Sequence, residues 1–189
     1  ALTERATGCS ITPPSPGMGL PAPQIFEAMG YYFAFKAAYP TSNITFTGHS
    51  LGGGLASLMA VLFDKHATVF DEAPFQPAAT TLALIPFYAL AMTASGIWDS
   101  ALGIYIASGG LLALSRESNV THYYVEGEVL NTIRISANTL VGSDNVIRLG
   151  NSTAGVVERH SMSLMAALWN SPPFLSAAQR LPDLVTELL

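Results

Sequence analysis

The chain is 189 residues long, half of its residues are hydrophobic, and only 11% carry a charge. Its 13 acidic residues outnumber its 8 lysines and arginines, and a net charge of −5 without a basic cluster excludes a nucleic-acid-binding protein. The single cysteine, Cys9, excludes an intramolecular disulfide framework and a cysteine-based zinc cluster.

The beginning of the chain predicts an extended arm followed by a helix. Residues 1–23 are rich in Thr, Pro and Gly and have no hydrophobic period, which is typical of an arm that wraps the surface. From Gln24 to Tyr39, apolar residues recur at helical spacing, and Pro40 ends the pattern. We therefore expect a helix that packs on one face.

Four later segments have the composition of short strands. They are rich in β-branched and aromatic residues and comprise residues 43–47, 66–70, 120–125 and 145–149. Helical patterns separate them, and a last one extends from Ser161 to Trp169. Strands that alternate with helices predict an α/β fold with a mostly parallel sheet and helices on both faces. The length predicts a single domain spanning residues 1–189.

A Gly-x-Ser-x-Gly motif lies between the first predicted strand and a helical run from Leu55 to Phe63. This context is that of a nucleophile elbow, a turn so tight that its flanking residues must be small. Gly48 and Gly52 leave room for strand and helix to cross, and the turn raises the Ser50 hydroxyl above the sheet. The Leu51 amide then points into the same space, so one turn supplies a nucleophile and an oxyanion donor.

The residues around this motif resemble a known family. Phe46-Thr47-Gly48-His49-Ser50-Leu51-Gly52-Gly53-Gly54-Leu55-Ala56 is similar to the elbow of the class 3 lipases, within the α/β-hydrolase superfamily. The likeness continues more weakly through Phe70-Asp71-Glu72-Ala73-Pro74 and Glu158-Arg159-His160-Ser161-Met162, over about half of the chain. It implies a compact, shortened α/β-hydrolase that cleaves esters, and it favours a secreted or extracellular location.

The serine needs a general base, and His160 is the best placed of the four histidines. It alone follows all four predicted strands, in a polar loop ahead of a helix, where the chain order Ser, acid, His puts the base. His49 adjoins Ser50, which points its ring away from the serine, and the resemblance makes it structural. His66 and His122 lie at or in strands, where packed or surface positions are expected.

The acid of the triad has four candidates. Glu128 lies nearest to the family's aspartate when Gly-Glu-Val-Leu is set against the family's pattern, although glutamate is a departure from it. Glu126 ends the same strand, and Asp71 follows the second strand on the catalytic edge. Asp144 precedes the fourth strand, which predicts a position at the opposite edge of the sheet.

A second oxyanion donor is expected from a loop after an earlier strand, but the residues before Ser50 contain no such strand. The upstream strand and the Arg-Gly-Thr-like turn of the family are missing. Either the chain is the C-terminal portion of a larger hydrolase, or a partner chain or the Pro-rich arm supplies this donor.

Residues 77–118 form the most apolar part of the chain and lie between the second and third strands. A cap is often inserted there in α/β-hydrolases, so the segment is a candidate lid that opens at a lipid interface. Buried core helices explain the composition equally well. A membrane span over Thr81 to Trp98 is a third alternative, interrupted by Pro86 and Gly96.

Together these features predict a serine carboxylesterase, of the esterase or triacylglycerol lipase kind, acting through Ser50, His160 and Glu128 and an acyl-enzyme. No metal and no organic cofactor is expected. A serine acyltransferase and a non-catalytic, hydrolase-like interaction domain are the alternatives. The expected partners are an ester or lipid substrate, a lipid interface, and a second copy or another chain that covers apolar surface.

Overall fold

The structure is a computed structural model, and it describes residues 23–130, 143–147 and 155–171. Within these residues, four parallel strands form one open sheet in the order β1-β2-β3-β4. They are β1 (Thr45–His49), β2 (His66–Phe70), β3 (Val120–Val125) and β4 (Ser143–Ile147). The predicted α/β fold with a parallel sheet is confirmed, whereas the arm predicted for residues 1–23 lies outside the described residues except for Pro23.

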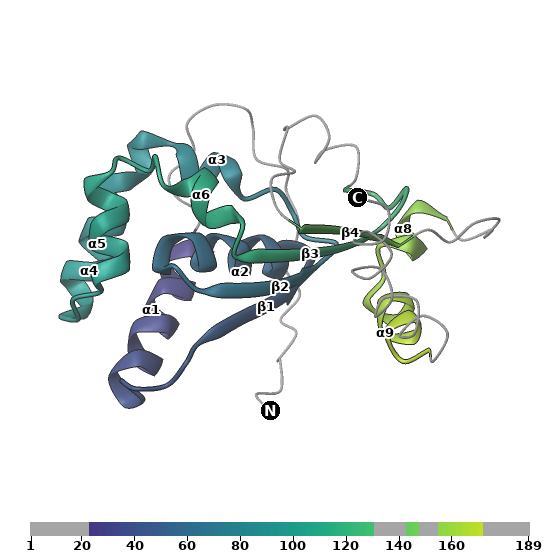
Figure 1. Cartoon of the computed structure of the whole chain (residues 1–189), viewed down its shortest axis with the longest axis horizontal. Coiled ribbons are helices and arrows are strands. Elements are labelled where there is room, and N and C mark those ends of the chain that lie inside the picture. Colours follow the sequence, from purple (N-terminus) through teal and green to yellow (C-terminus); the bar gives the residue numbers. More distant parts are fainter. Residues whose placement is uncertain (1–22, 131–142, 148–154, 172–189) are drawn as a thin grey trace, which may run out of the picture.

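Helices precede, connect and follow the strands (Figure 1). α1 (Pro23–Ala38) comes before the sheet, and α2 (Ser50–Phe63) connects β1 to β2. Between β2 and β3 the chain forms α3 (Gln76–Thr80), the 3-10 helix η1 (Leu82–Leu84), α4 (Ile85–Ser95), α5 (Ser100–Ala107) and α6 (Ala113–Glu117). α8 (Val156–Arg159) and α9 (Met162–Trp169) follow β4.

The two faces of the sheet are covered by different helices. Ala67, Val69 and Val120 are fully buried against Ala56 and Ala60 of α2, because alternate strand residues point to the same face. On the opposite face, the rings of Phe70 and Tyr123 stack, and Trp169 of α9 packs edge-on against both. Helices therefore lie on both faces, as the sequence predicted (Figure 1).

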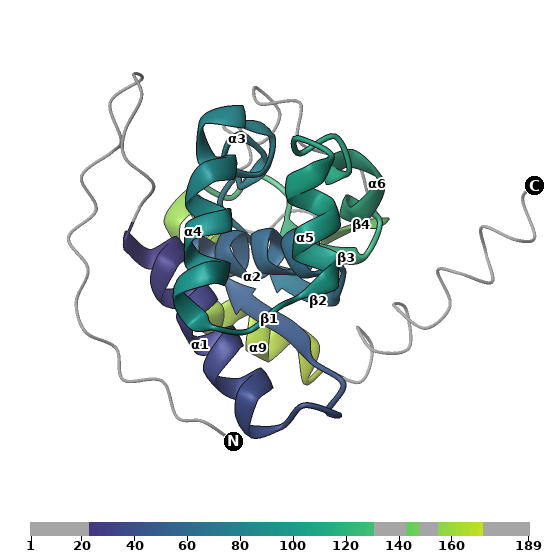
Figure 2. The ribbon, with the colours of Figure 1, turned by 90° about the vertical axis from the view of Figure 1, so that its left-hand side faces the viewer.

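The main hydrophobic core lies on the outer side of α2. Phe63 stacks on Tyr32 of α1 with ring centroids 3.8 Å apart, and Phe33 meets the same ring edge-on. α4 packs beside α5 and against α1 (Figure 2). The segment from residue 77 to 118 adds Tyr88, Leu102 and Tyr105 to this core, each at most 1% exposed. This segment thus supplies core side chains, as one of its three interpretations predicted.

The same segment also leaves large apolar side chains exposed, among them Trp98 and Leu111. Figure 1 shows α4 and α5 at the end of the sheet where the strands begin, whereas α8 and α9 lie where the strands end. None of the described helices is long and apolar enough to cross a membrane, and Thr81 to Trp98 forms η1 and the short helix α4. A lid function for residues 77–118 stays a prediction.

The buried side chain of Arg116 connects three helices near the end of the sheet where the strands begin. Arg116 donates hydrogen bonds of 3.0 Å to the carbonyl oxygens of Val61, Leu62 and Ala101. Its cation therefore neutralises the negative end of the α2 dipole, where carbonyl groups lack partners within the helix. Arg116 thereby joins α6 to the last turn of α2 and to the first turn of α5.

A second polar group joins α1 to α5. Asp99 caps α5 by accepting a hydrogen bond from the Leu102 amide, and it also pairs with Lys36 and accepts from the Tyr32 hydroxyl. Burial alone would raise the pKa of Asp99, but these hydrogen bonds and the Lys36 charge outweigh it and hold the pKa below its usual range. The ionised carboxylate is therefore the form that the fold stabilises.

Candidate active site

The turn between β1 and α2 is held by close backbone packing. A Cβ on Gly48 would lie 2.3 Å from the carbonyl oxygen of Gly52, and a Cβ on Gly53 would lie 2.6 Å from Cβ of Glu72. Side chains at these two positions would overlap atoms that cannot move away cheaply. A Cβ on Gly52 would meet nothing within 4 Å, so the prediction that Gly52 makes room as Gly48 does is wrong. The crowding at Gly52 involves its carbonyl group, not its missing side chain.

Ser50 itself has a left-handed backbone conformation, with φ of 55°. Few residues other than glycine adopt this conformation, and it is typical of a turn that holds a side chain in a functional position. The Ser50 carbonyl accepts a hydrogen bond of 2.9 Å from the Ala73 amide, which ties the elbow to the loop after β2. Leu51 lies in the first turn of α2, where amides have no acceptor within the helix.

Three side chains that are far apart in the sequence meet at the carboxyl ends of the strands. His160 Nε2 lies 2.9 Å from Ser50 Oγ, and His160 Nδ1 lies 2.8 Å from Glu128 Oε2. A carboxylate only accepts, so Nδ1 carries the hydrogen and Nε2 is left to accept the serine proton. The structure therefore brings together Ser50, His160 and Glu128 in the order that nucleophilic catalysis requires.

The Glu128 carboxylate is fixed from two sides and its side chain is fully buried. Its Oε2 atom also accepts a hydrogen bond of 2.7 Å from the Leu130 amide. The preceding turn is closed by the Glu128 amide, which donates to the Val125 carbonyl, and Gly127 has the positive φ of 76° that favours glycine. This turn carries the longer glutamate side chain from the end of β3 to His160.

Among the described residues, the hydrogen bond at His160 Nδ1 is made by Glu128 and not by one of the three competing acidic residues. Asp71 is buried at the end of β2, and its Oδ1 accepts a hydrogen bond of 2.9 Å from the Val125 amide. Glu126 is exposed, and its backbone carbonyl accepts a hydrogen bond from Arg159. Asp144 does not precede the fourth strand, because β4 begins two residues earlier than predicted and pairs Asp144 with His122. The prediction that Asp144 precedes the strand is therefore wrong, but as the second residue of β4 it lies toward the amino end of the strand, as predicted.

The other histidines have separate environments. His66 is exposed at the start of β2, and the buried His122 forms a 2.9 Å hydrogen bond with the buried Glu72. His49 is closer to the site than predicted, because its ring centroid lies 4.9 Å from that of His160. Its Nε2 atom lies 2.9 Å from the His160 carbonyl oxygen. The signal in the sequence was its position next to Ser50, at the edge where all these groups converge.

One group of side chains in the described residues has a geometry that would allow it to hold a metal ion. One ligand atom each of His49, Asp71 and His160 lies within 4.8 Å of the others. His160 Nε2 lies within hydrogen-bond distance of Ser50, and its Nδ1 within hydrogen-bond distance of Glu128. His49 Nε2 lies within the same reach of the His160 carbonyl oxygen. In this arrangement the ring nitrogens of His160 and the Nε2 atom of His49 are therefore engaged in hydrogen bonds.

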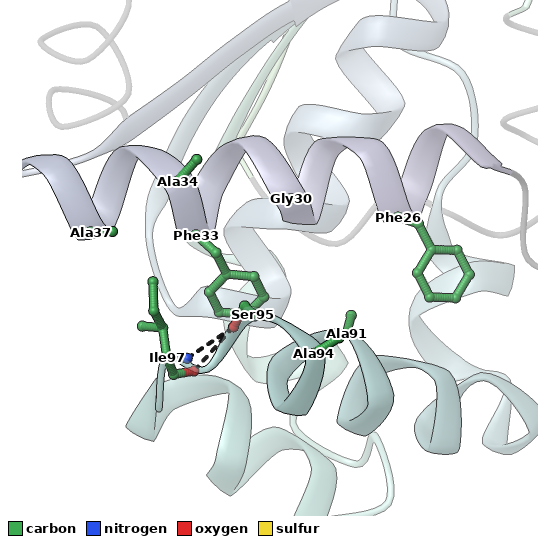
Figure 3. A pocket seen from close by; sticks show the side chains of 9 residues that line it. All are labelled: Phe26, Gly30, Phe33, Ala34, Ala37, Ala91, Ala94, Ser95 and Ile97. Atoms are coloured by element: carbon green, nitrogen blue, oxygen red, sulfur yellow. Dashed lines mark hydrogen bonds between the residues drawn. The ribbon is translucent and has the colours of Figure 1, made fainter.

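Among the apolar hollows of the described residues, one lies between two helices and another adjoins the elbow. A cavity of about 460 Å³ lies between α1 and α4, and small or apolar residues line it (Figure 3). Its polar member, Ser95, is hydrogen-bonded to the Met92 and Ile97 backbone, so this cavity offers no group for catalysis. A smaller hollow of about 120 Å³ is lined in part by Leu51, which follows Ser50 in the chain, and by Ala73, whose amide donates to the Ser50 carbonyl. This second hollow adjoins the elbow.

Comparison with protein-family models assigns the chain to a family. Residues 15–185 match the model of the Tle-like phospholipase domain, a phospholipase-like family. The chain belongs to this family. The match covers both sides of the site, from the elbow to His160, and it supports a lipid-hydrolysing enzyme. The predicted lipase-like hydrolase is thus confirmed at the level of a phospholipase-like family, whereas the match does not support the assignment to class 3.

Proposed function

We propose that the protein hydrolyses carboxylic esters of phospholipids, with Ser50 as nucleophile, His160 as general base and acid, and Glu128 as the carboxylate that orients His160. The hydrogen-bonded series from Glu128 through His160 to Ser50 carries this proposal. The likeness of residues 43–63 to the elbow of class 3 lipases supports it, as does membership of a phospholipase-like family.

The first half-reaction forms an acyl-enzyme. Ser50 Oγ attacks the ester carbonyl carbon while His160 Nε2 takes the hydroxyl proton, and Glu128 stabilises the imidazolium that results. The carbonyl oxygen becomes an oxyanion, and the Leu51 amide and the positive end of the α2 dipole stabilise it. When the C–O bond to the alcohol breaks, His160 returns the proton to the leaving oxygen, and a lysophospholipid departs.

Water completes the cycle by the same groups in reverse roles. His160 takes a proton from water, whose oxygen attacks the acyl carbon, and a second oxyanion forms at the same place. Collapse of this intermediate breaks the bond to Ser50 Oγ, which regains a proton from His160. The products are a fatty acid and the free enzyme.

The side chains present favour cleavage of the acyl ester over cleavage of the phosphodiester. The site offers an imidazole and backbone amides, which suit the single negative charge of a tetrahedral acyl intermediate. Phosphodiester cleavage would develop charge on a phosphoryl group, which enzymes generally stabilise with cations from arginine, lysine or metal ions. The groups hydrogen-bonded around Ser50 contain no such cation among the described residues.

The test combines covalent labelling with product analysis. The protein is treated with a fluorophosphonate, and the labelled peptide is located by mass spectrometry; separately, phosphatidylcholine vesicles and p-nitrophenyl esters are supplied as substrates. We expect the label on Ser50, with release of fatty acid and lysophospholipid. Ser50→Ala should abolish labelling and turnover, whereas Ser115→Ala, at an exposed position on α6, should change neither.

Each alternative has its own outcome in this experiment. Release of phosphocholine without fatty acid would contradict acyl-ester cleavage. Transfer of the acyl group to an added alcohol in preference to water would identify an acyltransferase. A wild-type protein that is neither labelled nor active would overturn the enzyme hypothesis and favour an interaction domain.

A further inference from the structure

We propose that His49 is a positioning residue that holds the His160 loop against the nucleophile elbow. It donates a hydrogen bond from its side chain to the backbone of the base, so the residue before the nucleophile fixes the residue that activates the nucleophile. This inference rests on the proposed function, because it assigns a role to His49 in the same reaction.

The contact joins two segments that are 111 residues apart. His49 Nε2 lies 2.9 Å from the His160 carbonyl oxygen. A carbonyl oxygen can only accept a hydrogen bond, so Nε2 of His49 must carry the hydrogen. The two imidazole rings lie 4.9 Å apart at an angle of 40°. His160 is thus held through its side chain by Glu128 and through its main chain by His49.

Asp71 lies close to the His49 side of this contact. Its Oδ2 atom lies 4.0 Å from His49 Nε2, and its side chain is fully buried. The carboxylate is fixed by the Val125 amide at Oδ1, while the Asp71 amide donates to the Tyr123 carbonyl at 2.8 Å. A carboxyl oxygen at this distance favours the tautomer of His49 with a hydrogen on Nε2. Asp71 also has a left-handed φ of 42°, which marks a position that its surroundings determine closely.

The base needs such a support because the helix before it is short. α8 has four residues, and His160 follows it directly as its C-cap. A helix of this length has little stability of its own, so contacts with other segments must set the position of the His160 backbone. A misplacement of about 1 Å between reacting groups can reduce a rate about 100-fold. The hydrogen bond from His49 constrains the carbonyl oxygen of the residue that carries the reacting imidazole.

The role predicts a specific kinetic change. His49 contacts the enzyme's own base and not the substrate, so loss of its donor should lower kcat and leave KM nearly unchanged. A residue that merely supports the fold would lower the amount of folded protein or Tm instead. A side chain that restores the donor should restore kcat, even when it is not aromatic.

The experiment compares His49→Phe, which keeps a ring and loses the donor, with His49→Gln, which keeps an amide donor. His66→Phe, at the exposed start of β2, is the matched control. The readouts are kcat and KM for a p-nitrophenyl ester, the rate of fluorophosphonate labelling of Ser50, and Tm. We expect His49→Phe to lower kcat and the labelling rate about 10- to 100-fold with KM within about twofold. His49→Gln should recover most of the loss, and His66→Phe should match the wild type.

Two results would overturn the proposal while leaving the proposed function intact. One is a wild type labelled at Ser50 with His49→Phe labelled equally fast. The other is an equal loss in His49→Phe and His49→Gln, which would assign the effect to the ring and not to the donor. If His49→Phe does not fold, the comparison of His49→Gln with wild type decides, together with imidazole ¹⁵N spectra of the wild type. A His49 Nε2 without hydrogen in those spectra would also contradict the assignment, independently of any activity.

Discussion

The elbow that carries Ser50 and the side of the site that carries Glu128 and His160 are held by different interactions. The elbow is fixed by backbone atoms at contact distance within a few residues, as the overlap predicted for a Cβ on Gly48 shows. Glu128 and His160 are fixed by side-chain hydrogen bonds between segments that are 32 residues apart, and His160 reaches Ser50 over 110 residues.

This difference separates two ways in which the protein can fail. Added atoms in the elbow disturb the crossing of β1 and α2 and therefore the fold, because packed interiors tolerate little extra volume. Substitutions of Glu128 or His160 by side chains of the same size keep the packing but disturb proton transfer between these residues and Ser50. Substitutions of the two kinds should therefore separate stability from activity.

After Ser50 itself, the largest effect on activity is expected at Glu128. Glu128→Gln keeps the shape but offers an amide to His160 Nδ1, which favours the wrong imidazole tautomer. We expect kcat for a p-nitrophenyl ester to fall about 100- to 10,000-fold with little change in Tm. Glu126→Gln, two residues earlier, is the control and should keep kcat within about twofold. An equal loss in both variants would show that the acid was assigned wrongly.

Substitutions in the elbow should change the free energy of unfolding. Gly48→Ala places a methyl group against the Gly52 carbonyl, and we expect a loss of about 2 kcal/mol or more in the free energy of unfolding. Gly52→Ala adds the same methyl group where nothing lies within 4 Å, and the helix preference for alanine should leave stability unchanged or slightly higher. Urea unfolding followed by circular dichroism measures both, and equal midpoints would contradict the packing argument.

A substitution beside the C-terminal end of α2, opposite Ser50, should change stability without changing activity. Arg116→Met leaves the carbonyls of Val61, Leu62 and Ala101 without their donor, and we expect a loss of about 2 to 4 kcal/mol. The specific activity of the folded fraction should be unchanged, because Ser50 lies at the other end of the helix. Lys65→Met removes a nearby charge without these bonds and should cost about 0.5 kcal/mol or less.

The smallest effect is expected at Asp99, as a change in how stability depends on pH in acid. Since the pKa of Asp99 is lower in the folded protein than in the unfolded chain, its stabilisation is fully present above the unfolded pKa of about 4. It is lost as the pH falls below that value through the folded pKa. We expect Asp99→Asn to make Tm less dependent on pH below about 4, relative to wild type. An unchanged slope of Tm against pH would contradict this linkage.

The local parts of the fold were accessible from the sequence. β2 and β3 have the predicted bounds, whereas β1 extends through Gly48 and His49, which the pattern assigned to the turn. Residues 77–118 are apolar on all sides, so hydropathy indicates no buried face. Their arrangement depends on contacts such as those of Tyr88 and Tyr105 with the core, which no local pattern contains.

The site divides in the same way. The position of Ser50 follows from a motif of five residues in its strand-to-helix context. The choice among the carboxylates does not, because Asp71 and Glu128 both follow strands that end at the same edge of the sheet. The direction of each side chain separates them: Asp71 bonds the Val125 amide, and Glu128 bonds His160. The contact of His49 with His160 likewise depends on the tertiary position of the last loop.

The left-handed φ of Ser50 implies a conflict between activity and stability at a single residue. A serine in this conformation costs about 1 kcal/mol or more relative to a relaxed backbone, and glycine avoids most of that cost. We expect Ser50→Gly to unfold at a higher urea concentration than Ser50→Ala, and both to be inactive. Stability alone would therefore favour glycine over serine at this position, and a serine held at this angle is what the proposed nucleophile requires.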